Sequence, residues 1–165
     1  MSDASSALRI RSATPDDATL LHELVTALAV YEREPDAVLA SPEDLRASLF
    51  GDGATAHAVI CEQDGQAVGF AVYFFNYSTW LGRNGLYLED LFVRPQARGQ
   101  GAGLALLRHL ARLAVQRGCG RFEWSVLDWN QPAIDFYTAV GARPMDEWTV
   151  YRLDGDRLAA FAASG

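Results

Sequence analysis

The sequence has few cysteines and no long hydrophobic run. Its two cysteines, Cys61 and Cys119, each lie in an apolar stretch typical of a strand, which favours two buried free thiols over a disulfide and predicts a reducing compartment. No stretch of about 18 apolar residues occurs, and residues 1–7 are polar. We therefore expect a cytoplasmic protein that is neither secreted nor membrane-spanning, with a flexible segment at residues 1–7.

Runs of positive charge are also absent. The formal net charge is −7, from 21 acidic and 14 basic side chains. An acidic chain without a basic cluster is a poor partner for nucleic acid or for an anionic membrane surface. A cationic small molecule fits this charge better, and the alternative is that the acidic surface serves solubility alone.

The three histidines lack metal-ligand spacing. His22 and His109 fall in helical patterns and His57 falls in a strand pattern. The sequence contains no HExxH motif and no Cys–His pairing of the zinc type. We predict no metal site.

Hydrophobic spacing alternates between strand and helix periods along the chain. We expect one domain, residues 1–165, because this length can bury a core of its own. The expected strands are residues 8–11, 57–62, 66–76, 85–93, 121–127 and 148–153. Helix starts are indicated at Thr14, Ser41 and Asn130, and a further apolar stripe begins at Leu104. This order predicts an α/β (α+β) protein, a mixed sheet with helices on its faces.

A glycine-rich turn joins the strand at residues 85–93 to the next helix. Gly99, Gly101 and Gly103 carry no Cβ, so a ligand can approach the backbone closely there. Free N–H groups and the helix dipole at such a turn favour an anion, and Arg98 adds charge. A phosphate ligand is the natural use of this turn, and a simple connecting turn is the alternative.

The spacing of these glycines excludes two common phosphate loops. A P-loop needs Gly-Lys-Ser/Thr, and a dinucleotide fingerprint needs Gly-x-Gly-x-x-Gly early in a βαβ unit; neither is present. The run Arg98-x-x-Gly101-x-Gly103 instead resembles the acetyl-CoA motif of the GNAT superfamily. Segments 29–32, 68–74, 86–93 and 129–137 together resemble its spermidine/spermine (diamine) acetyltransferase branch, within a likeness that runs from about residue 8 to residue 153.

The resemblance implies a fold, a cosubstrate and a set of site residues. The implied GNAT fold is a central twisted mixed sheet of about seven strands flanked by about four helices, with acetyl-CoA as cosubstrate and a homodimer as the assembly. Cofactor binding is implied for Leu91, Phe92, Val93, Arg98, Gly99, Gln100, Gly101, Ala102, Gly103, Leu104, Asn130, Ala133 and Tyr137. Amine binding is implied for Tyr31, Glu32, Glu89, Glu123, Trp124 and Ser125.

The expected chemistry needs a base and an acid. A protonated amine with a pKa of about 10.4 must lose a proton before it attacks a thioester. Glu89 can accept that proton directly or through water, and the alternative is a structural carboxylate paired with an arginine. The N–H of Leu91 can stabilise the oxyanion, and Tyr137, the catalytic tyrosine by resemblance, can protonate the departing thiolate.

Three functions remain open at this level. The first is acetylation of a small polyamine, diamine or lysine-like amine, with Glu32, Glu34 and Asp36 either holding an ammonium group or forming a solvated loop. The second is acetylation of a protein or peptide amine. The third is a non-catalytic acyl-CoA sensor, which the presence of Glu89 and Tyr137 disfavours.

Overall fold

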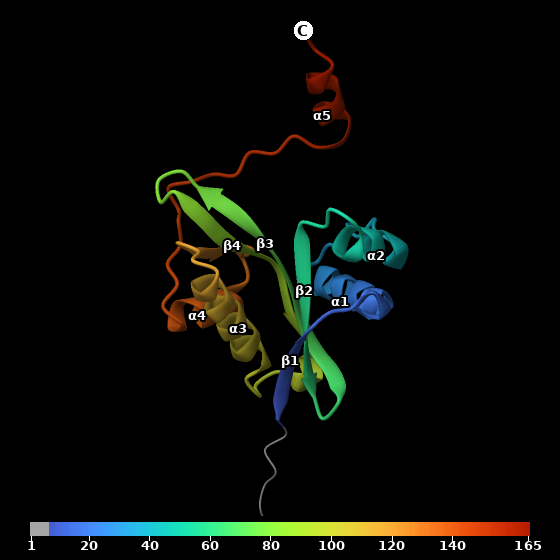
Figure 1. Cartoon of the computed structure of the whole chain (residues 1–165), viewed down its shortest axis with the longest axis vertical. Helices are drawn as coiled ribbons and strands as arrows, with labels where there is room; N and C mark the ends of the chain where they lie inside the picture. Colours follow the sequence, from blue (N-terminus) through green and yellow to red (C-terminus); the bar gives the residue numbers. More distant parts are fainter. Residues whose placement is uncertain (1–6) are drawn as a thin grey trace, which may run out of the picture. The chain divides into compact units, whose positions relative to one another are not determined.

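One five-stranded sheet organises the structure, a computed structural model that describes residues 7–165 (Figure 1). The expected flexible segment lies outside the described residues except for Ala7. The strands β1 (Leu8–Ser12), β2 (Ala56–Gln63), β3 (Gln66–Ser78), β4 (Arg83–Val93) and β5 (Phe122–Trp124) lie side by side in chain order. Strands β1 to β4 are antiparallel, and β5 runs parallel to β4. The predicted mixed sheet is confirmed.

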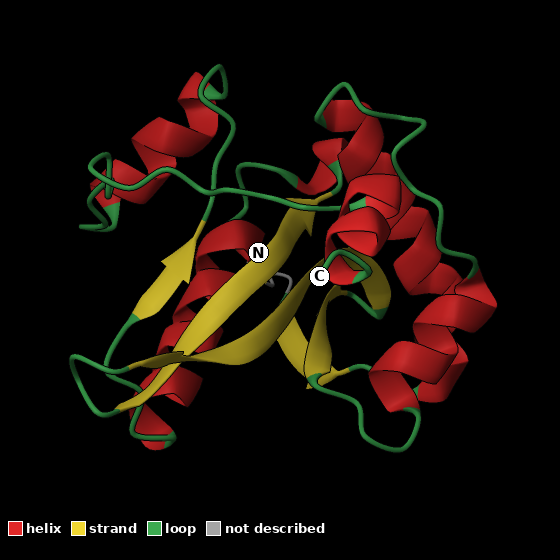
Figure 2. Ribbon diagram, turned by 90° about the horizontal axis from the view of Figure 1, so that it is seen from above, coloured by secondary structure: helices red, strands yellow, loops and turns green. Residues whose placement is uncertain are grey.

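Helices cover both faces of this sheet. Helices α1 (Ala18–Tyr31) and α2 (Pro42–Phe50) lie on one face and α3 (Ala102–Gln116) lies on the other (Figure 2), and short 3-10 turns, η1 (Pro15–Asp17) and η2 (Pro95–Ala97), precede α1 and the glycine loop. The core on the first face consists of Leu21, Leu24, Leu28, Ala58, Ile60, Phe70 and Phe92. Leu106, Leu107, Leu110 and Ala114 are the buried apolar stripe of α3.

A capping box of side-chain hydrogen bonds fixes the start of α2, and two residues with positive φ form the β2–β3 turn. Ser41 Oγ accepts a hydrogen bond from the Asp44 N–H at 3.1 Å, and the Asp44 carboxylate accepts one from the Ser41 N–H at 2.8 Å. This capping box satisfies donors that the first helical turn leaves free. Asp64 and Gly65, with φ of 51° and 76°, form the two-residue hairpin turn. Both features were predicted from the sequence and are confirmed.

A β-bulge divides β4 at Glu89. Val72 pairs with Asp90 and the next residue, Tyr73, pairs with Leu88, so Glu89 is an extra residue without a partner in β3. Side chains alternate between the two faces of a strand, and the extra residue shifts that alternation. As a result Asp90 lies on the same face as α1, whereas Leu88 lies on the face that α3 covers.

The chain divides into two compact units, and residues 126–165 form the second. Its helices are α4 (Gln131–Ala139) and α5 (Gly155–Ala162). Asn130 caps α4 as predicted, because its Oδ1 accepts the Ala133 N–H at 3.4 Å. Gly141 follows the helix with φ of 94°, as expected of a helix stop.

The expected last strand is wrong. Residues 148–153 form no strand, and Val150 and Tyr151 are 84% and 93% exposed. A β-type sequence becomes a strand only when a neighbouring strand pairs with it, and the five-stranded sheet of the described residues pairs no strand with this segment. The described part of the chain therefore has five strands rather than about seven and five α-helices rather than about four; β5 is shorter than predicted and α5 was not expected.

Candidate functional site

The glycine loop between η2 and α3 presents an open backbone. Gly99 and Gly101 have φ of 79° and 88°, and a Cβ added at either would meet no atom within 4 Å. Gly101 is the N-cap of α3, and Gly103 lies inside the first turn of that helix. Because the first N–H groups of a helix have no partner inside the helix, this end attracts an anion. The loop fits a phosphate group that is approached through backbone atoms.

Part of β4 is unpaired on the side of β5. Strand β5 pairs only with Leu86, Tyr87 and Leu88. Within the first unit, as far as it is described, no strand pairs with Leu91–Val93 on that side. Backbone groups on that side of β4 are available to an extended ligand that carries amides.

The side chains of two loop residues, Arg98 and Gln100, anchor the glycine loop. Arg98 Nε donates to the Val93 carbonyl at 3.0 Å, and its guanidinium lies 4.9 Å from the ring centre of Tyr31 and 5.6 Å from that of Phe92. Gln63 Nε2, at the end of β2, donates to Gln100 Oε1 at 2.6 Å. The loop is therefore attached both to the end of α1 and to the β2–β3 hairpin.

Three carboxylates gather where α1 ends and β4 bulges. Burial is the main cause that raises the pKa of Asp90 to about 6, and the charges of Glu89 and Glu32 raise it further. Burial also raises the pKa of Glu32. Glu89 is exposed, and among residues 7–165 no arginine forms an ion pair with it, so the structure does not favour the alternative of a paired structural carboxylate.

Asp90 is a residue that the sequence reasoning missed. Its neighbour Glu89 was selected by resemblance, and the adjacent acidic pair was the available signal. The bulge decides which of the two faces α1, and it arises from pairing with β3.

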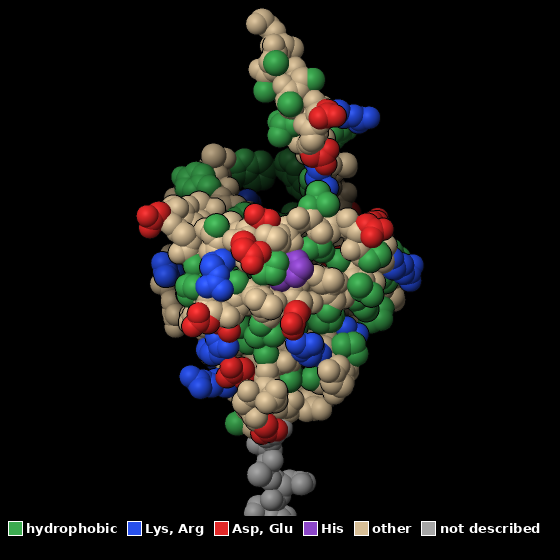
Figure 3. All heavy atoms as spheres, turned by 90° about the vertical axis from the view of Figure 1, so that its right-hand side faces the viewer, with side chains coloured by type: hydrophobic (Ala, Val, Ile, Leu, Met, Phe, Trp, Pro, Cys, Tyr) green, Lys and Arg blue, Asp and Glu red, His purple; other side chains and the backbone are tan. Residues whose placement is uncertain are grey.

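Glu34 and Asp36, the rest of the expected acidic cluster, are exposed in the loop after α1. On the face that Figure 3 shows, acidic and arginine side chains are interspersed.

The expected amine-binding residues Glu123 and Trp124 of β5 lie on opposite faces of the sheet. Glu123 pairs with Tyr87 in the ladder and forms an ion pair with Arg121 at 2.9 Å. Ser125 Oγ lies 2.8 Å from the Tyr87 hydroxyl. Trp124 points to the opposite face from Glu123, because neighbouring residues of a strand alternate.

Tyr87 is a second residue that the sequence reasoning missed. It packs against Phe74 with ring centres 5.2 Å apart, on the face that carries Asp90. The hydroxyl contact with Ser125 joins it to the end of β5. Its sequence signal, a tyrosine within an apolar strand, is the same as that of an ordinary core residue.

The second unit carries the remaining expected cofactor residues on α4. Asn130 is 8% exposed and caps the helix. Ala133 and Tyr137 are four residues apart and so share one face of α4. The Tyr137 ring lies 5.5 Å from the ring of Phe136.

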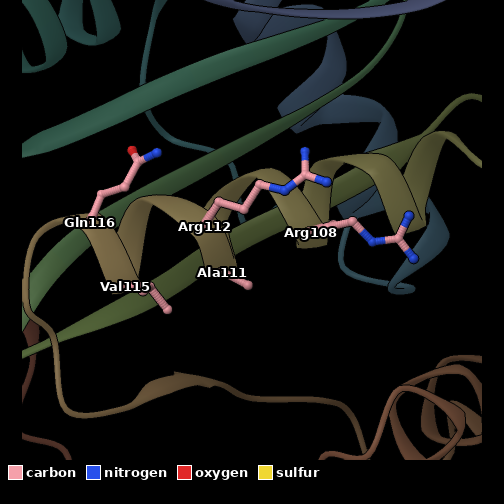
Figure 4. A pocket seen from close by; sticks show the side chains of 5 residues that line it. All are labelled: Arg108, Ala111, Arg112, Val115 and Gln116. Atoms are coloured by element: carbon pink, nitrogen blue, oxygen red, sulfur yellow. The ribbon is translucent and has the colours of Figure 1, made fainter.

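A shallow hollow of about 360 Å³ lies elsewhere, on the outer surface of α3. Arg108, Ala111, Arg112, Val115 and Gln116 line it (Figure 4). These residues belong to the middle and the end of the helix, away from its N-terminal loop.

The described residues contain no group of His, Cys, Asp or Glu that could hold a metal ion. They also contain no helix that is both long and apolar enough to span a membrane.

The mixed sheet, the strand–glycine loop–helix unit and the open edge of β4 define an α/β fold whose geometry suits an extended, phosphate-bearing ligand. The acetyltransferase (GNAT) family profile matches residues 21–142, and the chain belongs to this family. It is an acetyl-CoA-dependent N-acetyltransferase.

Similar proteins extend over nearly the whole chain. The thialysine N-epsilon-acetyltransferase of Sus scrofa is 38% identical over 164 residues, covering 93% of this chain and 96% of that protein. The L-ornithine N5-acetyltransferase NATA1 of Arabidopsis thaliana is 32% identical, covering 92% and 86%. An integron cassette protein from V. cholerae has a similar solved structure, with a TM-score of 0.81 and 29% identity, covering 95% of this chain and 98% of that one.

Proposed function

We propose that this enzyme acetylates the primary amine of a small polyamine, diamine or lysine-like substrate. The observation that carries the proposal is the group of carboxylates Glu32, Glu89 and Asp90, close to the anchored glycine loop, because an ammonium group is attracted to such a negative field. The names of similar proteins support it, since thialysine and ornithine are both small amino acids with a terminal amine.

The proposed cofactor side combines β4, the glycine loop and α4. Acetyl-CoA supplies the activated acetyl group when it is bound. The residues that hold it are Leu91, Phe92 and Val93 of β4, the loop residues Arg98, Gly99, Gln100, Gly101, Ala102, Gly103 and Leu104, and Asn130, Ala133 and Tyr137 of α4. The loop binds phosphate through backbone N–H groups, and β4 binds amides through its unpaired side.

Three groups move or hold charge in the proposed reaction. Glu89 accepts the proton of the ammonium group, directly or through water, which frees the amine for attack. The N–H of Leu91 stabilises the negative charge that develops on the acetyl oxygen. Tyr137 donates its phenolic proton to the departing thiolate. Glu32, Glu123, Trp124 and Ser125 complete the proposed amine side, and Tyr31, which the resemblance also implies there, contacts Arg98 of the glycine loop.

An amine panel with a tyrosine variant tests this function. Purified enzyme is assayed for acetyl-CoA-dependent thiol release with spermidine, spermine, putrescine, thialysine, lysine, ornithine and a peptide pool. The chain contains no lysine, so its own side chains offer no competing amine. We expect turnover with small amines, and Tyr137→Phe to lower kcat about 100-fold or more while CoA affinity is kept. Tyr77→Phe, on the exposed end of β3, is the matched control.

The outcomes separate the three functions. Equal rates for Tyr137→Phe and the wild-type enzyme remove Tyr137 from the mechanism. Turnover confined to the peptide pool favours a protein acceptor. Calorimetric binding of CoA without turnover across the whole panel favours a sensor.

We also propose a homodimer in the cytoplasm, with residues 1–165 as one GNAT domain. The free thiols of Cys61, which is buried, and Cys119 support a reducing compartment. The exposed apolar residues of the C-terminal segment, residues 145–161, support self-association. The family match from residue 21 to residue 142 supports the single domain, because it includes residues of both compact units.

A further inference from the structure

The ring of Tyr31 contacts the start of the glycine loop, because the guanidinium of Arg98 stacks over it. It is the last residue of α1 and packs against the apolar core on that face of the sheet. The guanidinium of Arg98 stacks over its ring at 4.9 Å and over the ring of Phe92 at 5.6 Å. Phe92 is 5% exposed, so both rings belong to a rigid platform.

The loop needs such an anchor because its backbone is flexible by composition. Gly99 and Gly101 adopt positive φ, a region that glycine enters readily but does not hold by itself. Each residue that must be ordered on ligand binding reduces affinity through lost conformational entropy. Arg98 fixes the loop where it begins, since Nε also donates to the Val93 carbonyl at 3.0 Å.

From these contacts we infer that Tyr31 is a positioning residue for acetyl-CoA: its ring holds Arg98 and thereby pre-orders the glycine loop. This role replaces the contact with the amine that the resemblance implies for Tyr31, and it rests on the proposed function. Glu32, the next residue, lies close enough to Asp90 for its charge to raise the pKa of that carboxyl. The end of α1 thus serves the cofactor side through Tyr31 and the amine side through Glu32.

The inference predicts different effects on the KM for acetyl-CoA and on the KM for the amine. Removing the aromatic face weakens the hold on Arg98, and a cation–π contact at an exposed site corresponds to a change of about threefold in an equilibrium constant. We expect Tyr31→Leu to raise both the KM for acetyl-CoA and the calorimetric Kd for CoA about threefold, with the amine KM unchanged at saturating acetyl-CoA. Tyr31→Phe keeps the ring and restores the acetyl-CoA KM to near the wild-type value.

A double-mutant cycle with Arg98→Met makes the test independent of folding defects. If Tyr31 acts through Arg98, adding Tyr31→Leu to Arg98→Met raises the Kd for CoA no further. Additive effects in the cycle overturn the inference, as does a rise in the amine KM with Tyr31→Phe. Should Tyr31→Leu unfold, the cycle is run with Tyr31→Met. If the wild-type protein binds no CoA, the proposed function itself is wrong. If the wild-type protein binds CoA and the Tyr31 variants bind it equally well, only the role of Tyr31 is wrong.

Discussion

Asp90 is the residue whose environment differs most from that of an ordinary surface carboxylate. Its pKa is raised to about 6 from a usual 3.8, first by burial and then by Glu89 and Glu32. Between these two pH values the folded protein binds more protons at this site than the unfolded chain does. The free energy of unfolding therefore falls as the pH rises from about 4 to 6, and above pH 6 the ionised carboxylate destabilises the fold by a constant amount.

Asp90→Asn removes this penalty without changing the size of the side chain. A shift of about two pKa units corresponds to about 3 kcal/mol, which solvent screening at a part-exposed site reduces to about 1–2 kcal/mol. We expect Asp90→Asn to be more stable than the wild-type protein by that amount at pH 8 and equal to it near pH 4, as measured by urea unfolding. Asp52→Asn, in the exposed turn after α2, serves as control. A difference that does not change with pH contradicts the prediction.

The opposite effect on activity is what gives Asp90 a functional meaning. A carboxylate that lies beside the proposed base and lowers the free energy of unfolding is typical of a functional site. Such sites keep charged groups that function needs although they destabilise the fold. Asp90→Asn should therefore lower kcat/KM for cationic amines under the same conditions in which it stabilises the protein. The two readouts together separate a binding group from a purely structural one.

At the scale of elements, the loop before α3 allows a sharp test with a matched control. Gly101 and Gly53 have φ of 88° and 77°, and neither has an atom within 4 Å of an added Cβ. Alanine at either position introduces backbone strain of about 1–2 kcal/mol and no steric clash within the protein. Gly101 alone of the two lies in the loop that we propose to bind the phosphate groups of CoA, so its new methyl group would obstruct them.

We expect Gly101→Ala to weaken CoA binding at least about tenfold, whereas Gly53→Ala leaves CoA affinity at its wild-type value. Calorimetry measures the two affinities, and thermal unfolding checks that both variants lose a similar amount of stability. Equal CoA affinities in the two variants would place the phosphates elsewhere.

Elements fixed by local chemistry were predictable from the sequence. The Ser41 capping box, the Asp64–Gly65 turn and the Asn130 cap each depend on residues within three positions of one another, and all three are present. The glycine loop was predicted for the same reason, because a strand, a turn and a helix follow each other directly there.

Features that depend on distant pairing were not predictable. The bulge at Glu89 exists because β3 and β4 differ by one residue between their paired positions, and it brings Asp90 to the face of α1. Residues 148–153 alternate as a strand does, yet strand formation requires a neighbour that local sequence does not specify. The contact of Arg98 with Tyr31 likewise joins residues that are far apart in the sequence.

At the scale of the whole molecule, the C-terminal segment carries several exposed large apolar residues. Its exposed large residues are Met145, Trp148, Val150, Tyr151, Leu153, Leu158 and Phe161. Exposed apolar residues that gather into a patch mark contact surfaces. A segment with the alternation of a strand can also pair with a strand of a second chain.

These properties predict a dimer that depends on the C-terminal segment. Light scattering after size exclusion should give twice the 18.0 kDa of one chain for the wild-type protein. Val150→Asp combined with Tyr151→Asp should shift the protein to the single-chain mass, because burying two carboxylates in an apolar contact is strongly unfavourable. Leu39→Asp places a charge at a residue that is 91% exposed in the loop between α1 and α2, and it should leave the dimer intact. A wild-type protein that stays at 18.0 kDa at high concentration contradicts the proposed homodimer, whereas a dimer that survives the double substitution moves the contact away from this segment.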